Sequence, residues 1–245
     1  MALDRLLALL GAPRGPLSAL APAAGLLSPL APPLCWGCGA HARSGPLCGA
    51  CRAQLQWLGP APVELRGIET WAPVAYDGPA RELVKALKFR GAQALADTMA
   101  AQIAVCAPPS IRAAAAGSRD PAAGNGGHSF ALVPVPLHPR RERRRGFNQA
   151  RLLADALAAR LDVPAWDGLD RRGPGSPQVG RSRSERLELG AGSGAIRAIR
   201  AAPLRVVLVD DVATTGATLA ACARALRAAG AAHITAVTYA RTPAR

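Results

Sequence analysis

The sequence predicts an α/β fold in which a mainly parallel sheet is flanked by helices and preceded by a small four-cysteine module. Short apolar runs without alternation recur from residue 68 onward, and amphipathic stretches lie between them. Unbroken apolar runs are typical of strands that are buried on both faces of a parallel sheet. Two Cys-x-x-Cys pairs precede this pattern. A chain of 245 residues is long enough for one such domain and a small appendage.

Residues 1–34 are rich in Leu, Ala and Pro, and they predict one short helix, Leu3–Leu10, followed by an extended lead-in. The stretch 15–42 carries no acid, Lys or Arg, but five prolines interrupt it. A membrane-spanning helix needs about 20 helical apolar residues, which this stretch does not offer. The N-terminus also lacks the clean apolar core of a signal peptide. We therefore expect a cytoplasmic protein without membrane insertion.

Residues 35–62 predict a zinc-binding module and its Gly-Pro-rich linker. Cys35 and Cys38 are two residues apart, as are Cys48 and Cys51, and nine residues separate the pairs. Two such turns aim four thiolates at one tetrahedral zinc ion, which is structural because no ligand position is left open. Disulfides are the competing interpretation, and a cytoplasmic location disfavours them. A redox Cys-x-x-Cys would not need a second copy.

Trp36 and Trp57 flank the four cysteines. They either pack against the rest of the chain, which is the favoured interpretation, or stack on a nucleobase. Cys106 and Cys222 stand alone in alanine-rich surroundings, which predicts that they are small buried hydrophobes.

The larger domain is expected over residues 68–245. Its expected elements, in order, are strand Ile68–Tyr76, helix Pro79–Phe89, helix Gln93–Val105, strand Phe130–Val135, helix Arg151–Leu161, strand Arg205–Val209, helix Ala217–Ala229 and strand His233–Tyr239. In the first helix Leu83, Val84 and Leu87 share one face, opposite a basic face. The segments 107–128 and 171–180 are rich in Gly and Pro, and they predict loops, the first of them a surface insertion.

The segment 206–218 predicts a binding site for a phosphorylated sugar. Its apolar strand brings Asp210 and Asp211 to the crevice where open α/β sheets bind ligands. The turn into the next helix offers backbone N–H groups to a phosphate, and Gly216 permits close approach. Two adjacent carboxylates can accept hydrogen bonds from vicinal sugar hydroxyls. An ordinary strand–helix connection is the weaker interpretation, because a helix cap needs a single Asp or Thr.

A basic run follows the strand that ends near residue 135. Pro134-Val135-Pro136 stiffens the turn, and five arginines come next at positions 140, 141, 143, 144 and 145. Arginine suits phosphate because its planar fork donates two bonds to one group. Two interpretations stay open, half of a diphosphate site or a solvated or nucleic-acid-facing loop. The net charge of +14, of which +12 lies beyond residue 70, fits phosphate-bearing partners or plain solubility.

Taken together, these motifs resemble the ComF family of competence proteins, and the resemblance covers nearly the whole chain. It rests on the cysteine pairs, the segments 133–149 and 206–218, Tyr76-x-Gly78-x2-Arg81 with Lys85 and Lys88, Gln178, and Glu185-Arg186. One departure is Leu189, which stands where the family usually has Asn. The resemblance implies a type I phosphoribosyltransferase-like domain behind an N-terminal zinc module.

The resemblance further implies binding of phosphoribosyl diphosphate, or of a related phosphorylated ribose ligand, together with Mg²⁺. Ribose hydroxyls would bind Asp210 and Asp211, and the 5-phosphate would bind the loop residues Ala213, Thr214, Thr215, Gly216, Ala217 and Thr218. The candidates for the diphosphate are Val135, Pro136, Arg140, Arg145, Asn148 and Gln149.

Two functions stay open from the sequence. One is transfer of a ribosyl 5-phosphate group, in which positioning and charge neutralisation supply the catalysis. The other is a non-enzymatic competence factor that holds single-stranded DNA or contacts the DNA-uptake machinery. The short tail after Tyr239 predicts no C-terminal hood to grip a base, so the acceptor is left open.

Overall fold

The computed structural model describes residues 33–43, 45–109, 111–112, 130–172 and 196–243. Several expectations lie outside these ranges. They are the helix Leu3–Leu10 and most of the lead-in, most of the insertion 107–128, Gln178, Glu185-Arg186 and Leu189.

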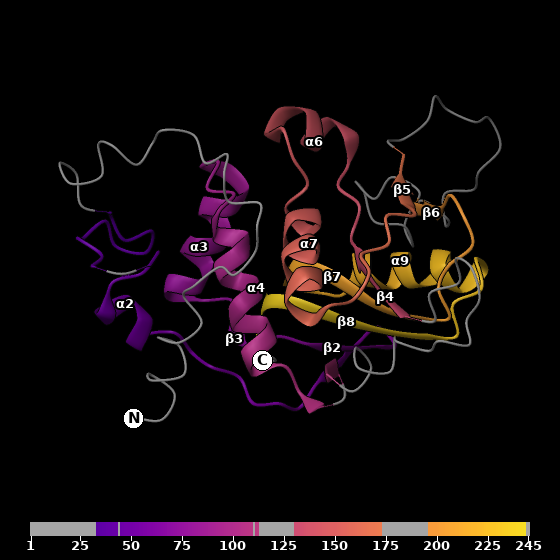
Figure 1. Cartoon of the computed structure of the whole chain (residues 1–245), viewed down its shortest axis with the longest axis horizontal. Coiled ribbons are helices and arrows are strands. Elements are labelled where there is room, and N and C mark those ends of the chain that lie inside the picture. Colours follow the sequence, from indigo (N-terminus) through magenta and orange to yellow (C-terminus); the bar gives the residue numbers. More distant parts are fainter. Residues whose placement is uncertain (1–32, 44, 110, 113–129, 173–195, 244–245) are drawn as a thin grey trace.

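A six-stranded sheet forms the centre of the molecule (Figure 1). Its strands are β1 (Val63–Leu65), β2 (Ile68–Trp71), β3 (Val74–Ala75), β4 (Phe130–Pro134), β7 (Arg205–Ala213) and β8 (His233–Arg241). The order across the sheet is β1-β2-β8-β7-β4, and β3 also pairs with β8. Every ladder is parallel except the one between β1 and β2. The expected α/β fold with a largely parallel sheet is confirmed.

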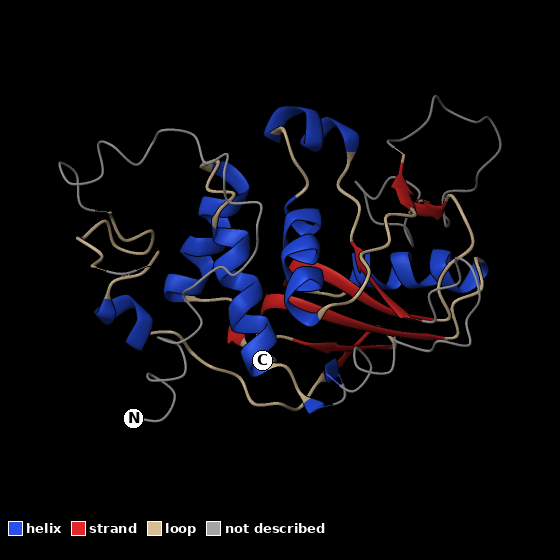
Figure 2. Ribbon diagram, viewed as in Figure 1, coloured by secondary structure: helices blue, strands red, loops and turns tan. Residues whose placement is uncertain are grey.

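Helices cover both faces of this sheet (Figure 2). Three of them pack with one apolar cluster, namely α3 (Gly78–Phe89), α4 (Leu95–Cys106) and α7 (Gln149–Leu161), and α9 (Ala217–Ala228) packs with a second. Strand β7 contributes side chains to both clusters, because Val207 and Val209 belong to the first while Val206 and Leu208 belong to the second. This double burial explains why the strand reads as an unbroken apolar run.

The four expected helices of the larger domain are confirmed to within two residues at most ends. Leu83, Val84 and Leu87 are fully buried on α3, as the periodicity predicts. The expected strand Ile68–Tyr76 is instead two short strands, β2 and β3, which both pair with β8. The gap between them contains Pro73, which has no N–H to donate to a ladder.

The cysteine-containing segment packs onto this domain beside α3 (Figure 1). Its only described helix is α2 (Gly49–Ala53), and Leu47, Cys51 and Leu55 are buried in the same cluster as α3 and α4. A backbone bond from the Ala75 N–H to the Gln56 carbonyl, 2.9 Å long, adds a second attachment. Trp36 packs against the cluster as expected, whereas Trp57 is 39% exposed.

Cys222 is fully buried in α9, as expected, and Cys106 is half-buried at the end of α4. No helix within the described ranges is both long enough and apolar enough to span a bilayer.

Candidate functional site

The acidic pair lies within the end of β7, which runs further than the sequence indicates. The ladder with β8 continues past Val209, pairing Asp210 with Thr238 and Ala213 with Arg241. Because successive side chains of a strand point to opposite faces, the two acids leave β7 on different sides. Asp211 contacts Lys88 of α3, and Asp210 lies near enough to Cys222 of α9 and to Arg171 of the strand β5 (Leu169–Arg171) to influence their pKa values.

Asp211 is almost completely buried and is held by a lysine from a distant part of the chain. Its Oδ2 lies 2.8 Å from Lys88 Nζ, and the two side chains are 3% and 22% exposed. Lys88 ends the basic face of α3, so the contact joins the first helix of the domain to its central strand. The sequence marks Lys88 within the family motif but gives no signal of which acid it pairs with.

The surroundings of Asp210 disfavour its charged form. Its Oδ1 accepts the backbone N–H of Asp211 at 2.8 Å. Burial, and then the neighbouring charge of Asp211, raise the pKa of Asp210 well above its ordinary value, while Lys88 opposes this shift. A cation, or hydroxyl donors from a ligand, would stabilise the ionised carboxylate of Asp210.

The loop after β7 presents an open helix start. Thr214, Thr215 and Ala217 are exposed, and the N-cap residue of α9 is Gly216, which has no side chain to cap the helix. The Ala217 N–H donates to Thr215 Oγ1 at 3.4 Å. Gly216 is buried behind them at φ 71°, where an added Cβ would lie 2.7 Å from Leu65 Cβ. Uncapped N–H groups at a helix start are a ready site for an anion.

The turn between β1 and β2 holds this loop from behind. The Arg66 side chain donates from Nε to the Thr215 carbonyl at 3.1 Å. Together with the contact of Leu65 on Gly216, this bond fixes the backbone of the loop while its outer side stays accessible.

The end of β4 lies beside the end of β7. The Val135 N–H donates to the Val209 carbonyl at 2.9 Å, and the Val135 carbonyl accepts from Asn148 Nδ2 at 3.1 Å. Asn148 also caps α7, since its Oδ1 accepts the Ala150 N–H at 3.0 Å. The expected diphosphate candidates Val135, Pro136 and Asn148 therefore follow the strand that neighbours the acids.

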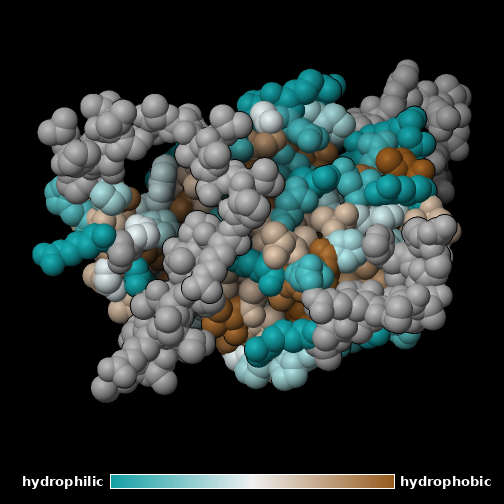
Figure 3. Space-filling model, in the orientation of Figure 1, coloured by the Kyte–Doolittle hydropathy of each residue, from teal (hydrophilic) through white to brown (hydrophobic). Residues whose placement is uncertain are grey.

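The arginine run forms a helix, α6 (Pro139–Arg145), where the sequence indicates a loop. His138 caps its start, Pro139 takes the first position, and Gly146 ends it in the left-handed region at φ 83°. Four of its arginines, at positions 140, 141, 143 and 144, are exposed, and hydrophilic side chains gather over this helix (Figure 3). Arg140 makes no ion pair with an acid of the described ranges.

Arg145 differs from the rest of the run because it turns inward. Its guanidinium lies 5.2 Å from the centre of the Phe89 ring and donates to the buried side chain of Gln149. Burial lowers the pKa of Arg145, and the nearby Asp211 charge opposes that shift. The structure thus brings Arg145 and Gln149 to the acids and leaves Arg140 on the outside.

Arg171 is a site residue that sequence reasoning missed. It ends β5, which pairs with β6 (Ile196–Ala198) in a short antiparallel ladder. Burial lowers the pKa of Arg171, while the nearby Asp210 opposes this shift. Strands of three residues without an apolar run give no periodic signal, so the sequence indicates only a loop there.

The four cysteines of the N-terminal module converge. Their sulfur atoms all lie within 4.8 Å of one another, and Cys38 and Cys48 are 3.7 Å apart. Tetrahedral zinc with Zn–S bonds of about 2.3 Å places its sulfurs about 3.8 Å apart. A disulfide would need about 2.05 Å. The arrangement therefore fits a single metal ion.

Backbone donors favour the thiolate form of Cys35, whereas burial raises the pKa of Cys51. Cys35 Sγ accepts the Cys48 N–H at 3.3 Å and the Gly37 N–H at 3.4 Å. Burial opposes these bonds, but together they lower the pKa of Cys35 to about 6. A Cβ on Gly37 would lie 2.9 Å from Cys51 Sγ, so a glycine is needed for the sulfurs to meet.

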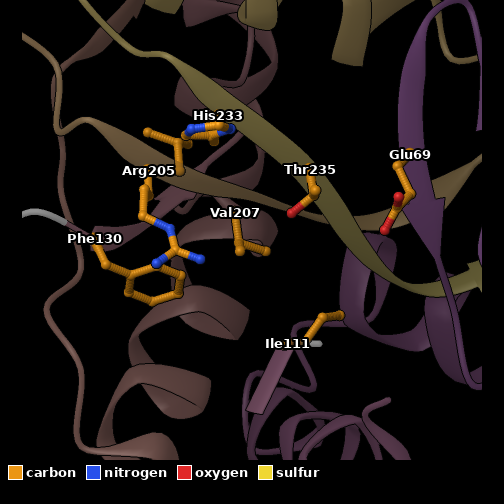
Figure 4. Close-up of a pocket in the computed structure, with 8 residues that line it drawn as sticks. Glu69, Ile111, Phe130, Arg205, Val207, His233 and Thr235 are labelled. Carbon is orange, nitrogen blue, oxygen red and sulfur yellow. The ribbon is translucent and has the colours of Figure 1, made fainter. Parts of the chain in front are cut away.

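A cavity of about 230 Å³ lies at the opposite edge of the sheet (Figure 4). Phe130, Arg205 and His233, the first residues of β4, β7 and β8, line it together with Glu69 and Thr235. It contains none of the residues that the sequence indicates as a ligand site.

Comparisons with known proteins identify a domain family and several relatives. Residues 148–245 match the family described as phosphoribosyl transferase domain. The chain is 30% identical over 209 residues to competence protein F of Haemophilus influenzae, covering 80% of this chain and 85% of that protein. It is 41% identical over 97 residues to competence protein ComFC of Bacillus subtilis, covering 40% and 38%. It is 39% identical over 104 residues to DNA utilization protein YhgH of Salmonella typhi, covering 42% and 45%.

Proposed function

Because the chain belongs to the ComF family of competence proteins, we propose that it binds phosphoribosyl diphosphate, or a related phosphorylated ribose, with Mg²⁺ at the carboxyl edge of its sheet. The observation that carries the proposal is the pair of half-buried Asp210 and buried Asp211, which precedes the exposed loop at the start of α9. The process that we propose it serves is competence or DNA utilization, the terms that appear in its relatives' names.

In this proposal the ligand lies across the end of β7. The ribose hydroxyls donate to Asp210 and Asp211 at the end of this strand. The 5-phosphate accepts from the loop and helix start formed by Ala213, Thr214, Thr215, Gly216, Ala217 and Thr218, of which Thr214, Thr215 and Ala217 are exposed. The diphosphate lies against Val135, Pro136 and Asn148, with Arg145 and Gln149 beside it. Arg140 is left for the outer surface.

Mg²⁺ fits the donors present, because carboxylate oxygens and phosphate oxygens are the ligands that this ion prefers. The surroundings that disfavour the charged form of Asp210 support the fit, since a divalent ion would stabilise that form. When bound, Mg²⁺ would neutralise the diphosphate charge.

Transfer would break the bond between ribose C1 and the diphosphate oxygen and form a bond from C1 to the acceptor, whose proton is released. The chain contributes position and charge. The loop and the acids hold the ribosyl phosphate, and the positive charge of Arg145 stabilises the departing diphosphate. No side chain needs to act as a nucleophile.

The cysteine cluster is proposed to hold one structural zinc ion through Cys35, Cys38, Cys48 and Cys51. The cluster shares its apolar contacts with α3 and α4, so the ion would also steady the domain that carries the ribose site. Thiolate ligands of this kind persist in a reducing compartment, and we place the protein in the cytoplasm.

A second function is favoured by α6, whose exposed arginines form a basic helix above the sheet. A non-enzymatic competence factor would use this helix to hold the backbone of single-stranded DNA. The binding would fall steeply with salt, because each phosphate contact releases counterions.

Calorimetry and fluorescence anisotropy separate the two functions. Phosphoribosyl diphosphate is titrated with and without Mg²⁺ into the wild type and into Asp210→Asn with Asp211→Asn, which should lose about 100-fold in affinity. Asp97→Asn, an acid on α4 paired with Arg160, is the control and should bind normally. Labelled single-stranded DNA is titrated at two salt concentrations into Arg143→Ala with Arg144→Ala. No donor binding, beside salt-sensitive DNA binding lost in the arginine variant, would replace the first function with the second.

A further inference from the structure

The cavity at the edge of the sheet where β4, β7 and β8 begin lies apart from the proposed ribose site, which is at the edge where these strands end. Its volume of about 230 Å³ is below the roughly 300–1,000 Å³ of pockets that hold drug-sized ligands. A cavity of this size suits a compound as small as an amino acid.

The residues that line this cavity form two rows on one face of the sheet. The first row joins the first residues of three neighbouring strands, which the ladders pair: Phe130, Arg205 and His233. The second row lies two residues further along and consists of Val207, Thr235 and Glu69. Residues two apart on a strand point to the same face, so both rows are directed to the same side of the sheet. Phe130 and Val207 belong to the apolar cluster that includes α4 and α7, which identifies that side.

The floor of the cavity is apolar. Phe130 and Val207 from the sheet are buried, as is Ile111 from the segment after α4. The Ile111 N–H donates to the Pro108 carbonyl at 3.1 Å, which holds this segment near the end of the helix. Thr235 is half-buried and adds a hydroxyl group to the lining. A ligand therefore finds an apolar surface with polar groups around it.

Groups of opposite charge stand on the two sides of this floor. Figure 4 shows Arg205 and His233 on one side of the cavity and Glu69 on the other. All three are exposed, and none forms an ion pair with a residue that the structure describes. Glu64 of β1 is paired with Glu69 in the antiparallel ladder and adds a second exposed carboxylate there. Arginine keeps its charge and histidine donates a hydrogen bond in either protonation state, so one side suits an anion and the other a cation.

The spacing of the two sides fits a small zwitterion. Neighbouring strands are about 4.8 Å apart and two residues of a strand span about 6.6 Å, so the Cα atoms of His233 and Glu69 are roughly 8 Å apart. A charge-assisted hydrogen bond at each end takes about 2.8 Å. About 3 Å is then left between the charged groups of the ligand, which is the spacing of the carboxylate and ammonium groups in an α-amino acid.

We propose that this cavity binds a free α-amino acid with an apolar side chain. The carboxylate of the ligand accepts hydrogen bonds from Arg205 and His233, and its ammonium group donates to Glu69. Its side chain lies on the apolar floor. The site shares no residue with the proposed ribose site, so the two proposals stand or fall separately.

The probe is L-leucine, titrated into ¹⁵N-labelled full-length protein and followed by the shifts of the amide signals. Two analogues each lack one charged group, because isocaproate has no ammonium group and isoamylamine has no carboxylate. Leucine should shift the amides of Glu69, Arg205 and His233 in a saturable way. It should bind about 10- to 100-fold more tightly than either analogue, which is the usual effect of a hydrogen bond to a charged group.

Two variants remove the charged partners one at a time. Glu69→Gln should remove most of the preference for leucine over isocaproate, and Arg205→Gln should remove most of the preference for leucine over isoamylamine. Arg227→Gln, which removes an exposed arginine of α9, is the matched control and should bind leucine as the wild type does. Amide signals that are unchanged away from the cavity show that each variant is folded.

Three results would overturn the proposal. The first is a wild type that shows no saturable binding of leucine. The second is isocaproate binding as tightly as leucine, because the carboxylate of Glu69 would then play no part. The third is a loss of leucine binding in Arg227→Gln as large as the loss in Arg205→Gln. None of these results bears on the binding of ribose 5-phosphate at the other edge of the sheet.

Discussion

Lys88 Nζ lies 2.8 Å from Asp211 Oδ2, and this ion pair places a positive charge beside the acids at the end of β7. It ties α3 to the central strand across more than a hundred residues of sequence. Any cation or ligand that binds the acids must share Asp211 with this ammonium group. The stability and the binding properties of the site are therefore linked through one pair.

Replacing Lys88 by Met should destabilise the protein by about 2–4 kcal/mol at pH 7, because it leaves a buried carboxylate without its partner. Chemical denaturation measures the change. Lys85→Met is the matched control, since Lys85 pairs with Glu82 near the surface and should cost about 0–1 kcal/mol. Equal losses in the two variants would mean that the Asp211 pair is not the buried contact described.

Asp210→Asn should stabilise the folded protein at neutral pH while weakening ligand binding. The folded-state pKa of Asp210 is raised, so the folded protein binds its proton more tightly than the unfolded chain does. The stabilisation that this tighter proton binding supplies is complete at pH values below the pKa of Asp210 in the unfolded chain. It is lost as the pH rises through the pKa of Asp210 in the folded protein. Denaturation at pH 5 and pH 8 should show the advantage of the variant growing with pH.

Glu64→Gln is the control for this experiment, because it removes an exposed carboxylate on β1. It should show no such trend. An Asp210→Asn protein that is less stable than the wild type at pH 8 would contradict the claim that the surroundings of Asp210 disfavour its charged form.

Much of this site can be predicted from the sequence, because its parts are local. The loop 214–218 and the acids occupy one continuous segment, and the apolar run before them predicts a doubly buried strand. The turn Val135–Pro136 and the cap Asn148 likewise follow one strand and start one helix. Local patterns of this kind fix the elements and the edge of the sheet at which they end.

The parts that the sequence leaves open depend on distant contacts. Lys88 meets Asp211, and Phe89 meets Arg145, through the packing of α3 against the sheet, which has no periodic signature. The arginine run is typical of a charged loop, yet the structure shows a helix there. His138 caps its start, and Gly146 ends it in the left-handed region. The strand β5 is too short to be recognised, so Arg171 was missed.

Gly216→Ala should weaken phosphate binding and cost more stability than a comparable glycine change elsewhere. At φ 71° any Cβ is strained, and here it would also lie 2.7 Å from Leu65 Cβ. Gly230, at the other end of α9, has φ 106° with open space around it and is the control. Thermal denaturation should show Gly216→Ala less stable than Gly230→Ala by about 1–3 kcal/mol. Equal costs would mean that the loop yields easily and is not held by the β1–β2 turn.

The purified protein should contain one zinc ion per chain, measured by inductively coupled plasma mass spectrometry. Cys38→Ser should lower the zinc content and the midpoint of thermal unfolding, because the cluster shares its core with α3 and α4. Cys106→Ala is the control and should retain zinc, since Cys106 lies outside the cluster. A zinc-free wild type that is equally stable with and without a chelator would show that the thiols do not hold a structural ion.

The central claim, that a phosphorylated ribose binds at the carboxyl edge of the sheet, is tested most directly by titrating ribose 5-phosphate into ¹⁵N-labelled protein. The largest amide shifts should fall on Thr214–Thr218 and on Asp211. Shifts concentrated instead on Glu69, Arg205 and His233, which line the cavity at the opposite edge, would contradict the claim.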